Sequence, residues 1–175
     1  MVVVMKMVSE NYVKNVKAAR KSWPGAIVLD PTLGGAMKKL DPACPIGRVK
    51  APGKKWIESL SILGIWEGLK VFSKKDVVDY SFLKDERKLG KVRGCKSYGR
   101  MIGIRIDEEV IDESVAVDEV FVKLYKETIG KRFGNLIEGI KEQAKSRTVV
   151  LLDYPEGKEK YPKSHVEILK EMIEE

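Results

Sequence analysis

Two short apolar runs, each followed by an aspartate and a proline, constrain the fold of this chain more than any other feature. Residues 26–29 lead into Asp30-Pro31, and residues 148–152 lead into Asp153-Tyr154-Pro155. Apolar runs of four or five residues between turn residues have the length of a buried strand, whereas a buried helix is usually longer. Residues 98–106 could form a third strand. We therefore expect two or three short buried strands.

Most of the remaining chain has helical periodicity, with apolar residues three and four positions apart. Helices are expected after an N-cap at Ser9, over 57–72, 115–130 and 132–145, and after Ser164, with 74–88 partly helical and Asp76 as a cap. Ser164 and Glu167 have the spacing of a capping box. The pattern predicts a helix-rich α+β or α/β fold, and a length of 175 residues predicts a single domain over 1–175.

Residues 30–56 interrupt this regularity. They contain four prolines, four glycines and six basic side chains, with Asp41 as the only acid after Asp30. Loops of this length are uncommon inside a compact domain and are usually functional or disordered. The stretch is the most densely basic part of the sequence.

Charge is divided unevenly along the chain, which carries +7 overall. Residues 1–100 hold 21 basic and 9 acidic side chains, a net of +12, whereas residues 101–175 hold 12 and 17, a net of −5. A basic face that meets phosphate or nucleic acid would explain the division. The ion-pair-rich surface of a heat-adapted protein would explain the charge density better than its asymmetry.

Several classes of protein are not expected. No apolar run reaches the roughly 20 residues that cross a bilayer, and residues 1–7 are too short and too soon interrupted for a signal peptide. Cys44 and Cys95 form no CxxC pair and have no histidine nearby, although a disulfide between them stays open. We expect a cytoplasmic protein with no membrane partner, no metal and no cofactor.

Glu67 is the most interesting candidate for chemistry because it lies in an otherwise apolar helix. It follows Trp66 and precedes Gly68, whose cost in a helix of about 1 kcal/mol suggests that another group approaches closely there. With Lys70 three residues on, Glu67 could be an acid or base, or a ligand for a sugar hydroxyl. The alternative is a Glu–Lys contact on a solvated helix face.

Two further places could bind a ligand. Gly99-Arg100 ends a basic run, and Arg100 could hold a phosphate with two hydrogen bonds or belong to a solvated loop. His165, the only histidine, lies at a predicted helix N-terminus near Asp153 in sequence; a surface or packing role is the alternative.

Several separated motifs resemble a prokaryotic family of unknown function. Its GIWxGLKVF helix is similar to residues 64–72, and the match extends in order over about residues 22–172. The other matching stretches are Pro45-Ile-Gly with Pro52-Gly, Tyr98-Gly-Arg100, Val149-Val-Leu-Leu-Asp-Tyr154, and Ser164-His165.

That family is more distantly similar to the NADAR superfamily, which is associated with N-glycosidic bond cleavage and ADP-ribose chemistry. The resemblance places the superfamily's helix lysine on Lys70 and its Gly-Arg turn on Gly99-Arg100. Its glutamate would align with Leu63, while Glu67 stands where a glutamine is expected. The resemblance therefore implies either that Glu67 has taken over the acid or base role, or that this branch binds a related ligand without cleaving it.

Three hypotheses follow. The first is an N-glycosidase or a binding protein for a phosphoribosyl or ADP-ribosyl compound, with Glu67 catalytic and Trp66, Lys70 and Arg100 as ligand contacts. Gly99, Asp153 and His165 complete the predicted ligand-binding set. The second is a nucleic-acid-binding module that uses the basic first 100 residues, with aromatic side chains for stacking. The third is a homo-oligomer in which the basic and acidic halves associate.

Overall fold

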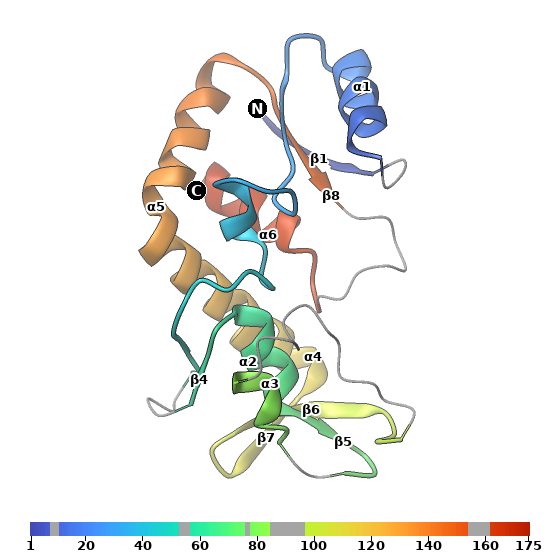
Figure 1. The fold of residues 1–175 in the computed structure, drawn as a ribbon, viewed down its shortest axis with the longest axis vertical. Coiled ribbons are helices and arrows are strands. Elements are labelled where there is room, and N and C mark those ends of the chain that lie inside the picture. Colours follow the sequence, from blue (N-terminus) through green and yellow to red (C-terminus); the bar gives the residue numbers. More distant parts are fainter. Residues whose placement is uncertain (8–10, 53–56, 76–77, 85–96, 154–161) are drawn as a thin grey trace. The chain divides into compact units, whose positions relative to one another are not determined.

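A computed structural model describes residues 1–7, 11–52, 57–75, 78–84, 97–153 and 162–175 (Figure 1). The chain is a helix-rich α+β protein, as predicted. Its contacts divide it into two compact units, residues 1–41 with 129–175 and residues 42–128. The single domain over 1–175 stays a prediction.

The first unit is built on a three-stranded parallel sheet in the order β1-β8-β2. Both predicted strands at 26–29 and 148–152 are confirmed as β2 and β8. The N-terminal strand β1 was not predicted. The elements of this unit are β1 (Val2–Lys6), α1 (Tyr12–Ser22), β2 (Ile27–Leu29), the 3-10 helix η1 (Met37–Leu40), most of α5 (Lys123–Ser146), β8 (Val149–Asp153) and α6 (His165–Glu174).

Alternation along β8 assigns the two faces of this sheet. Val150 and Leu152 pack in a buried cluster with Ala19 of α1, so α1 covers their face. Leu151 and Asp153 point to the other face, and α6 packs against β1 and β8. The register of β1 with β8 pairs Lys6 with Asp153 at the carboxyl ends of both strands.

The second unit contains two small antiparallel sheets, β3-β4 and β5-β6-β7. Its core includes Trp66, Phe121 and Tyr125. The ring centres of Trp66 and Phe121 are 5.6 Å apart, and those of Phe121 and Tyr125 are 6.5 Å apart. The elements are β3 (Val49–Lys50), β4 (Glu58–Ser59), α2 (Ile62–Leu69), β5 (Lys70–Phe72), α3 (Ser81–Lys84), β6 (Met101–Ile106), β7 (Glu109–Asp112), α4 (Glu113–Ala116), the π-helix η3 (Val117–Val122) and the start of α5.

Three predicted helix boundaries were wrong. The helix expected over 57–72 is shorter, because Ser61 caps it and Lys70 leaves helical geometry to start β5. The break expected at Gly130 lies three residues later, because two helices meet within α5 at a kink with non-helical angles at Phe133. The first helix is capped by Asn11, whose side chain accepts from the Lys14 N–H; Ser9 lies outside the described residues.

Other expectations were partly met. The strand within 98–106 is confirmed as β6, and the partly helical 74–88 contains α3, where Asp79 accepts hydrogen bonds from Ser81. Asp76 lies outside the described residues. The stretch 30–56 has more structure than predicted, because η1 and β3 fall within it. In the described residues, no helix combines the length and apolar character needed to cross a membrane.

Candidate functional site

Glu67 of α2 and Lys70, the first residue of β5, form a buried ion pair. The Lys70 Nζ lies 2.5 Å from the Glu67 Oε1, and the two side chains are 10% and 0% exposed respectively. Trp66 is also buried, and the ammonium lies 6.0 Å from the centre of its ring. The intrahelical contact considered from the sequence is therefore present, but it lies in the interior and not on a solvated face. The catalytic role of Glu67 stays a prediction.

Gly99 and Arg100 lie in the turn that precedes β6. Gly99 has a φ of +85°, and a Cβ there would collide with the Ser73 hydroxyl, so the turn requires glycine. Arg100 is exposed and lines a cavity of about 450 Å³ together with Asp112, Glu113 and Ser114. Because two acids share this cavity with the guanidinium, it is poorly suited to a phosphate.

The structure does not bring Arg100 to the Glu67–Lys70 pair. Lys70 is opposite Ile104 in the β5-β6 ladder, and Arg100 precedes Ile104 by four residues. At about 3.3 Å per residue, the two backbone positions are about 13 Å apart along the strand. The Arg100 cavity includes neither Glu67 nor Lys70 among its lining residues.

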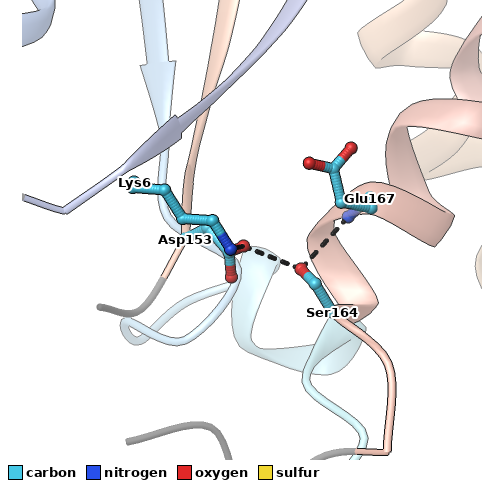
Figure 2. A network of polar contacts seen from close by, with 4 residues as sticks. All are labelled: Lys6, Asp153, Ser164 and Glu167. Atoms are coloured by element: carbon cyan, nitrogen blue, oxygen red, sulfur yellow. Dashed lines mark hydrogen bonds and ion pairs between the residues drawn. The ribbon is translucent and has the colours of Figure 1, made fainter. Parts of the chain in front are cut away.

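Asp153 and His165 belong to the first unit, at the carboxyl end of its sheet. The Asp153 carboxylate is buried, pairs with Lys6 at 3.2 Å and accepts a hydrogen bond from Ser164 at 2.8 Å (Figure 2). His165 follows Ser164 as the first residue of α6 and is fully buried. Because Asp153 already joins two elements of the fold, these contacts hold α6 to the sheet.

The predicted capping box at α6 is half formed. Ser164 accepts from the Glu167 N–H at 3.4 Å. The Glu167 carboxylate points away from Ser164 (Figure 2).

A cavity beside α2 was not predicted from the sequence. It has a volume of about 400 Å³, within the range of pockets that bind small molecules. Its floor is apolar, and its rim carries two cations, a carboxylate and an exposed tyrosine. The lining residues are Arg48, Ile57, Glu58, Ser59, Leu60, Tyr80, Leu83 and Lys84.

Two glycines of α2 build this cavity. A Cβ at Gly64 would collide with the Ser59 side chain, and one at Gly68 would lie 2.7 Å from the Leu83 Cδ2. The close approach inferred from Gly68 is therefore confirmed. Ser59 of β4 and Leu83 of α3 both line the cavity. The two glycines therefore allow β4 and α3 to pack closely against α2, where they form the cavity wall. The glycine spacing was the sequence signal available for this site.

The rim residues carry complementary charges. Arg48 Nε lies 3.7 Å from the Glu58 Oε2, with the arginine side chain 84% exposed and the glutamate 30% exposed. Tyr80 is 50% exposed, and Lys84 is exposed beside it on α3. An exposed aromatic ring above an apolar floor offers a stacking surface, and the cations can bind an anion.

Nothing in the described part of the chain groups three or more metal-ligating side chains. Cys44 is half-buried, and Cys95 lies outside the described residues, so their pairing stays untested.

Comparison with known families places the chain. Residues 11–169 match the family of unknown function DUF6939. The chain belongs to this family. No curated protein matches the sequence. The matched residues span both units and therefore include the α2 cavity and the Asp153 contacts. The function of DUF6939 is unknown, so the match assigns no activity.

Proposed function

We propose that this DUF6939 protein binds a small phosphorylated ribosyl compound in the cavity beside α2. The observation that carries the proposal is the lining of that cavity, where two cations and an exposed tyrosine surround an apolar floor. Pockets of this kind, with few polar groups over apolar walls, are the usual form of small-molecule sites. The proposal includes the predicted cytoplasmic location.

Each rim group suits one part of such a ligand. Arg48 and Lys84 supply the positive charge that a phosphate requires, and arginine can donate two hydrogen bonds to it. The Tyr80 ring can stack on a base or cover a ribose. Glu58 can accept hydrogen bonds from ribose hydroxyls, as acidic residues do in dinucleotide sites.

Cleavage of an N-glycosidic bond would use Glu58. As the carbon–nitrogen bond breaks, the base leaves with its electron pair and takes up a proton from solvent, and positive charge develops on the ribose. A nearby carboxylate stabilises that charge and accepts a proton from the water whose oxygen bonds to the anomeric carbon. Glu67 and Leu63 are buried in α2, whereas Glu58 lines the cavity. We therefore assign the catalytic carboxylate of this proposal to Glu58.

Ligand-linked stabilisation tests the binding step. Wild-type protein is heated with ADP-ribose, NAD, ribose 5-phosphate and nucleotides in turn. A ligand at a hundred times its Kd stabilises the folded state by about 2.7 kcal/mol, which raises Tm measurably. Tyr80→Ala and Lys84→Gln should remove the shift. Tyr12→Ala and Lys74→Gln change exposed residues outside the cavity and should retain it.

The outcomes separate binding from cleavage. If no compound shifts Tm, or if the cavity variants and their controls respond alike, the binding proposal is wrong. If a ligand binds, release of its base is followed by chromatography with wild-type and Glu58→Gln protein. Base release that is lost in Glu58→Gln, with the Tm shift retained, supports cleavage by Glu58; binding without release identifies a binding protein.

A further inference from the structure

The outward face of α1 carries four exposed basic side chains and one exposed apolar side chain, Val13. Lys14, Lys17, Arg20 and Lys21 are all exposed, and the helix buries Asn15 and Ala19 on its opposite side. At 3.6 residues per turn, the four cations occupy an arc of about 120° centred opposite the buried pair.

Within the described residues, these cations lack the acidic partners that several other surface lysines have. No acidic residue occurs in Tyr12–Ser22, and none of the four cations has an ion pair within the described residues. Elsewhere, four helical lysines pair with a glutamate one turn away: Lys123 with Glu119, Lys141 with Glu138, Lys145 with Glu142, and Lys170 with Glu174.

Unpaired like charges of this kind destabilise a helix. Lys17 has three basic neighbours at spacings of three or four residues, Lys14, Arg20 and Lys21. Each such pair costs about 0.2–0.5 kcal/mol. An ion-pair-rich surface therefore does not explain α1, whereas an anionic partner would relieve the repulsion.

We propose that the basic face of α1 binds the phosphate backbone of a nucleic acid. From Lys14 to Lys21 the helix rises about 10.5 Å. A DNA duplex carries one charge per about 1.7 Å of its axis, so that length presents about six phosphate charges to four cations. The match in charge and length favours a polyanion over a single small anion.

The packing of α1 disfavours a membrane as the partner. An interfacial helix binds a bilayer by inserting its apolar face among the lipids. In this protein Ala19 lies in the buried cluster against the sheet, so that side of α1 is already occupied. Protein interfaces are depleted of charge at their centres, which does not fit four adjacent cations.

Salt dependence measures the number of phosphate contacts. For a duplex, each contact contributes about −0.9 to the slope of log K against log salt, so four contacts predict a slope of about −3.6. Affinity should then fall about 150-fold between 50 and 200 mM salt. We would measure this by fluorescence anisotropy with the full chain and a labelled duplex of about 20 base pairs.

Two matched variants locate the contacts. In the first, Lys14, Lys17, Arg20 and Lys21 are changed to glutamine, which has similar helix propensity. In the second, the ion-paired Lys141, Lys145, Lys163 and Lys170 of the same unit are changed to glutamine. Both variants lose four positive charges. The α1 variant should lose binding, and the paired-lysine variant should keep the wild-type slope.

The single variant Lys17→Gln keeps the test valid if the fourfold α1 variant fails to fold. It should reduce the magnitude of the salt slope by about 0.9. Equal loss of affinity in both fourfold variants would assign the effect to net charge and overturn the proposal. An unchanged slope in Lys17→Gln would also overturn it. So would binding of the wild type to phosphatidylserine-containing vesicles without binding to the duplex.

Discussion

Removal of the Glu67 charge should destabilise this protein far more than removal of an exposed glutamate with the same spacing. Glu67 and Lys70 are three residues apart, buried, and joined at 2.5 Å. Glu67→Gln keeps the side-chain volume but leaves the Lys70 ammonium in the interior without its carboxylate. Breaking a buried pair in this way costs about 3–5 kcal/mol.

This loss is large relative to the total stability of a small protein, which is about 5–15 kcal/mol. With a urea m value of about 2 kcal/mol/M, a loss of 4 kcal/mol moves the unfolding midpoint by about 2 M. Urea unfolding followed by far-ultraviolet circular dichroism measures the midpoint directly, and an unchanged m value shows that stability alone has changed.

Glu142→Gln is the matched control. Glu142 and Lys145 are also three residues apart, at 2.6 Å, but both side chains are 72% exposed. Exposed pairs typically contribute 1 kcal/mol or less, so the control midpoint should shift by about 0.5 M at most. If Glu67→Gln shifts the midpoint no more than Glu142→Gln, the pair is not buried in solution. The interior assignment of Glu67 would then be refuted.

Two further predictions concern a glycine and a carboxyl group. Gly64→Ala should destabilise the protein by about 1–3 kcal/mol because the added Cβ collides with Ser59. Gly139→Ala should stabilise it by up to about 1 kcal/mol, because the added Cβ meets no neighbouring group within 4 Å. Thermal unfolding measures the change in stability of both variants. The two hydrogen bonds from Ser114 lower the pKa of Asp112, with a smaller contribution from Arg100, so Ser114→Ala should raise that pKa towards its ordinary value in an NMR titration. A carboxyl group whose pKa is lower in the folded state stabilises the fold at pH values above its unfolded-state pKa. The contribution of Asp112 should therefore be lost as the pH falls through its folded-state pKa. An unchanged Asp112 pKa in Ser114→Ala would contradict the assignment.

The strands that the sequence predicted best are those with a local signature. Val149 to Leu152 are consecutive apolar residues between turn residues, which describes a fully buried parallel strand, and all are buried. β7 was missed because its residues Glu109–Asp112 are mostly charged or exposed and pair with β6 only across a tight turn. Pairing of that kind depends on a partner strand, which a pattern within one segment does not record.

The end of α2 was mispredicted for a related reason. Val71 and Phe72 continue the apolar spacing of the helix, so periodicity alone extends it through them. Both side chains are buried either way, but in the fold their backbone pairs with Gly103 and Met101 of β6. Pairing with β6 therefore selected the strand over the helix, although either conformation would bury the same two residues.

Glu67 illustrates what helical spacing does not reveal. Spacing correctly placed its carboxylate beside Lys70, but the solvated face assumed for the pair does not exist. All eight residues of Ile62–Leu69 are buried, and a helix that is apolar nearly all round is an interior helix. The same consideration moves the proposed chemistry to Glu58, since a buried counterion of Lys70 does not also face a ligand in the cavity.

The cavity beside α2 depended on residues distant in sequence. Arg48, Glu58 and Lys84 come from three separate segments, and none is distinctive alone. What the sequence did contain was Gly68, which is costly in a helix unless something packs against it. Leu83 is that neighbour and also lines the cavity, so Gly68 indicated the close approach but not the cavity itself.

The charge asymmetry can now be divided between two causes. Four helical lysines in the second half of the chain pair with glutamates one turn away, which is the pattern of an ion-pair-rich surface. α1 is richer in lysine and arginine than α5 or α6 and contains no acids, so the same cause does not account for it. The basic surplus of residues 1–100 therefore includes a helix face whose charges repel one another unless an anion lies against them, and this repulsion is the physical basis for expecting a polyanionic partner.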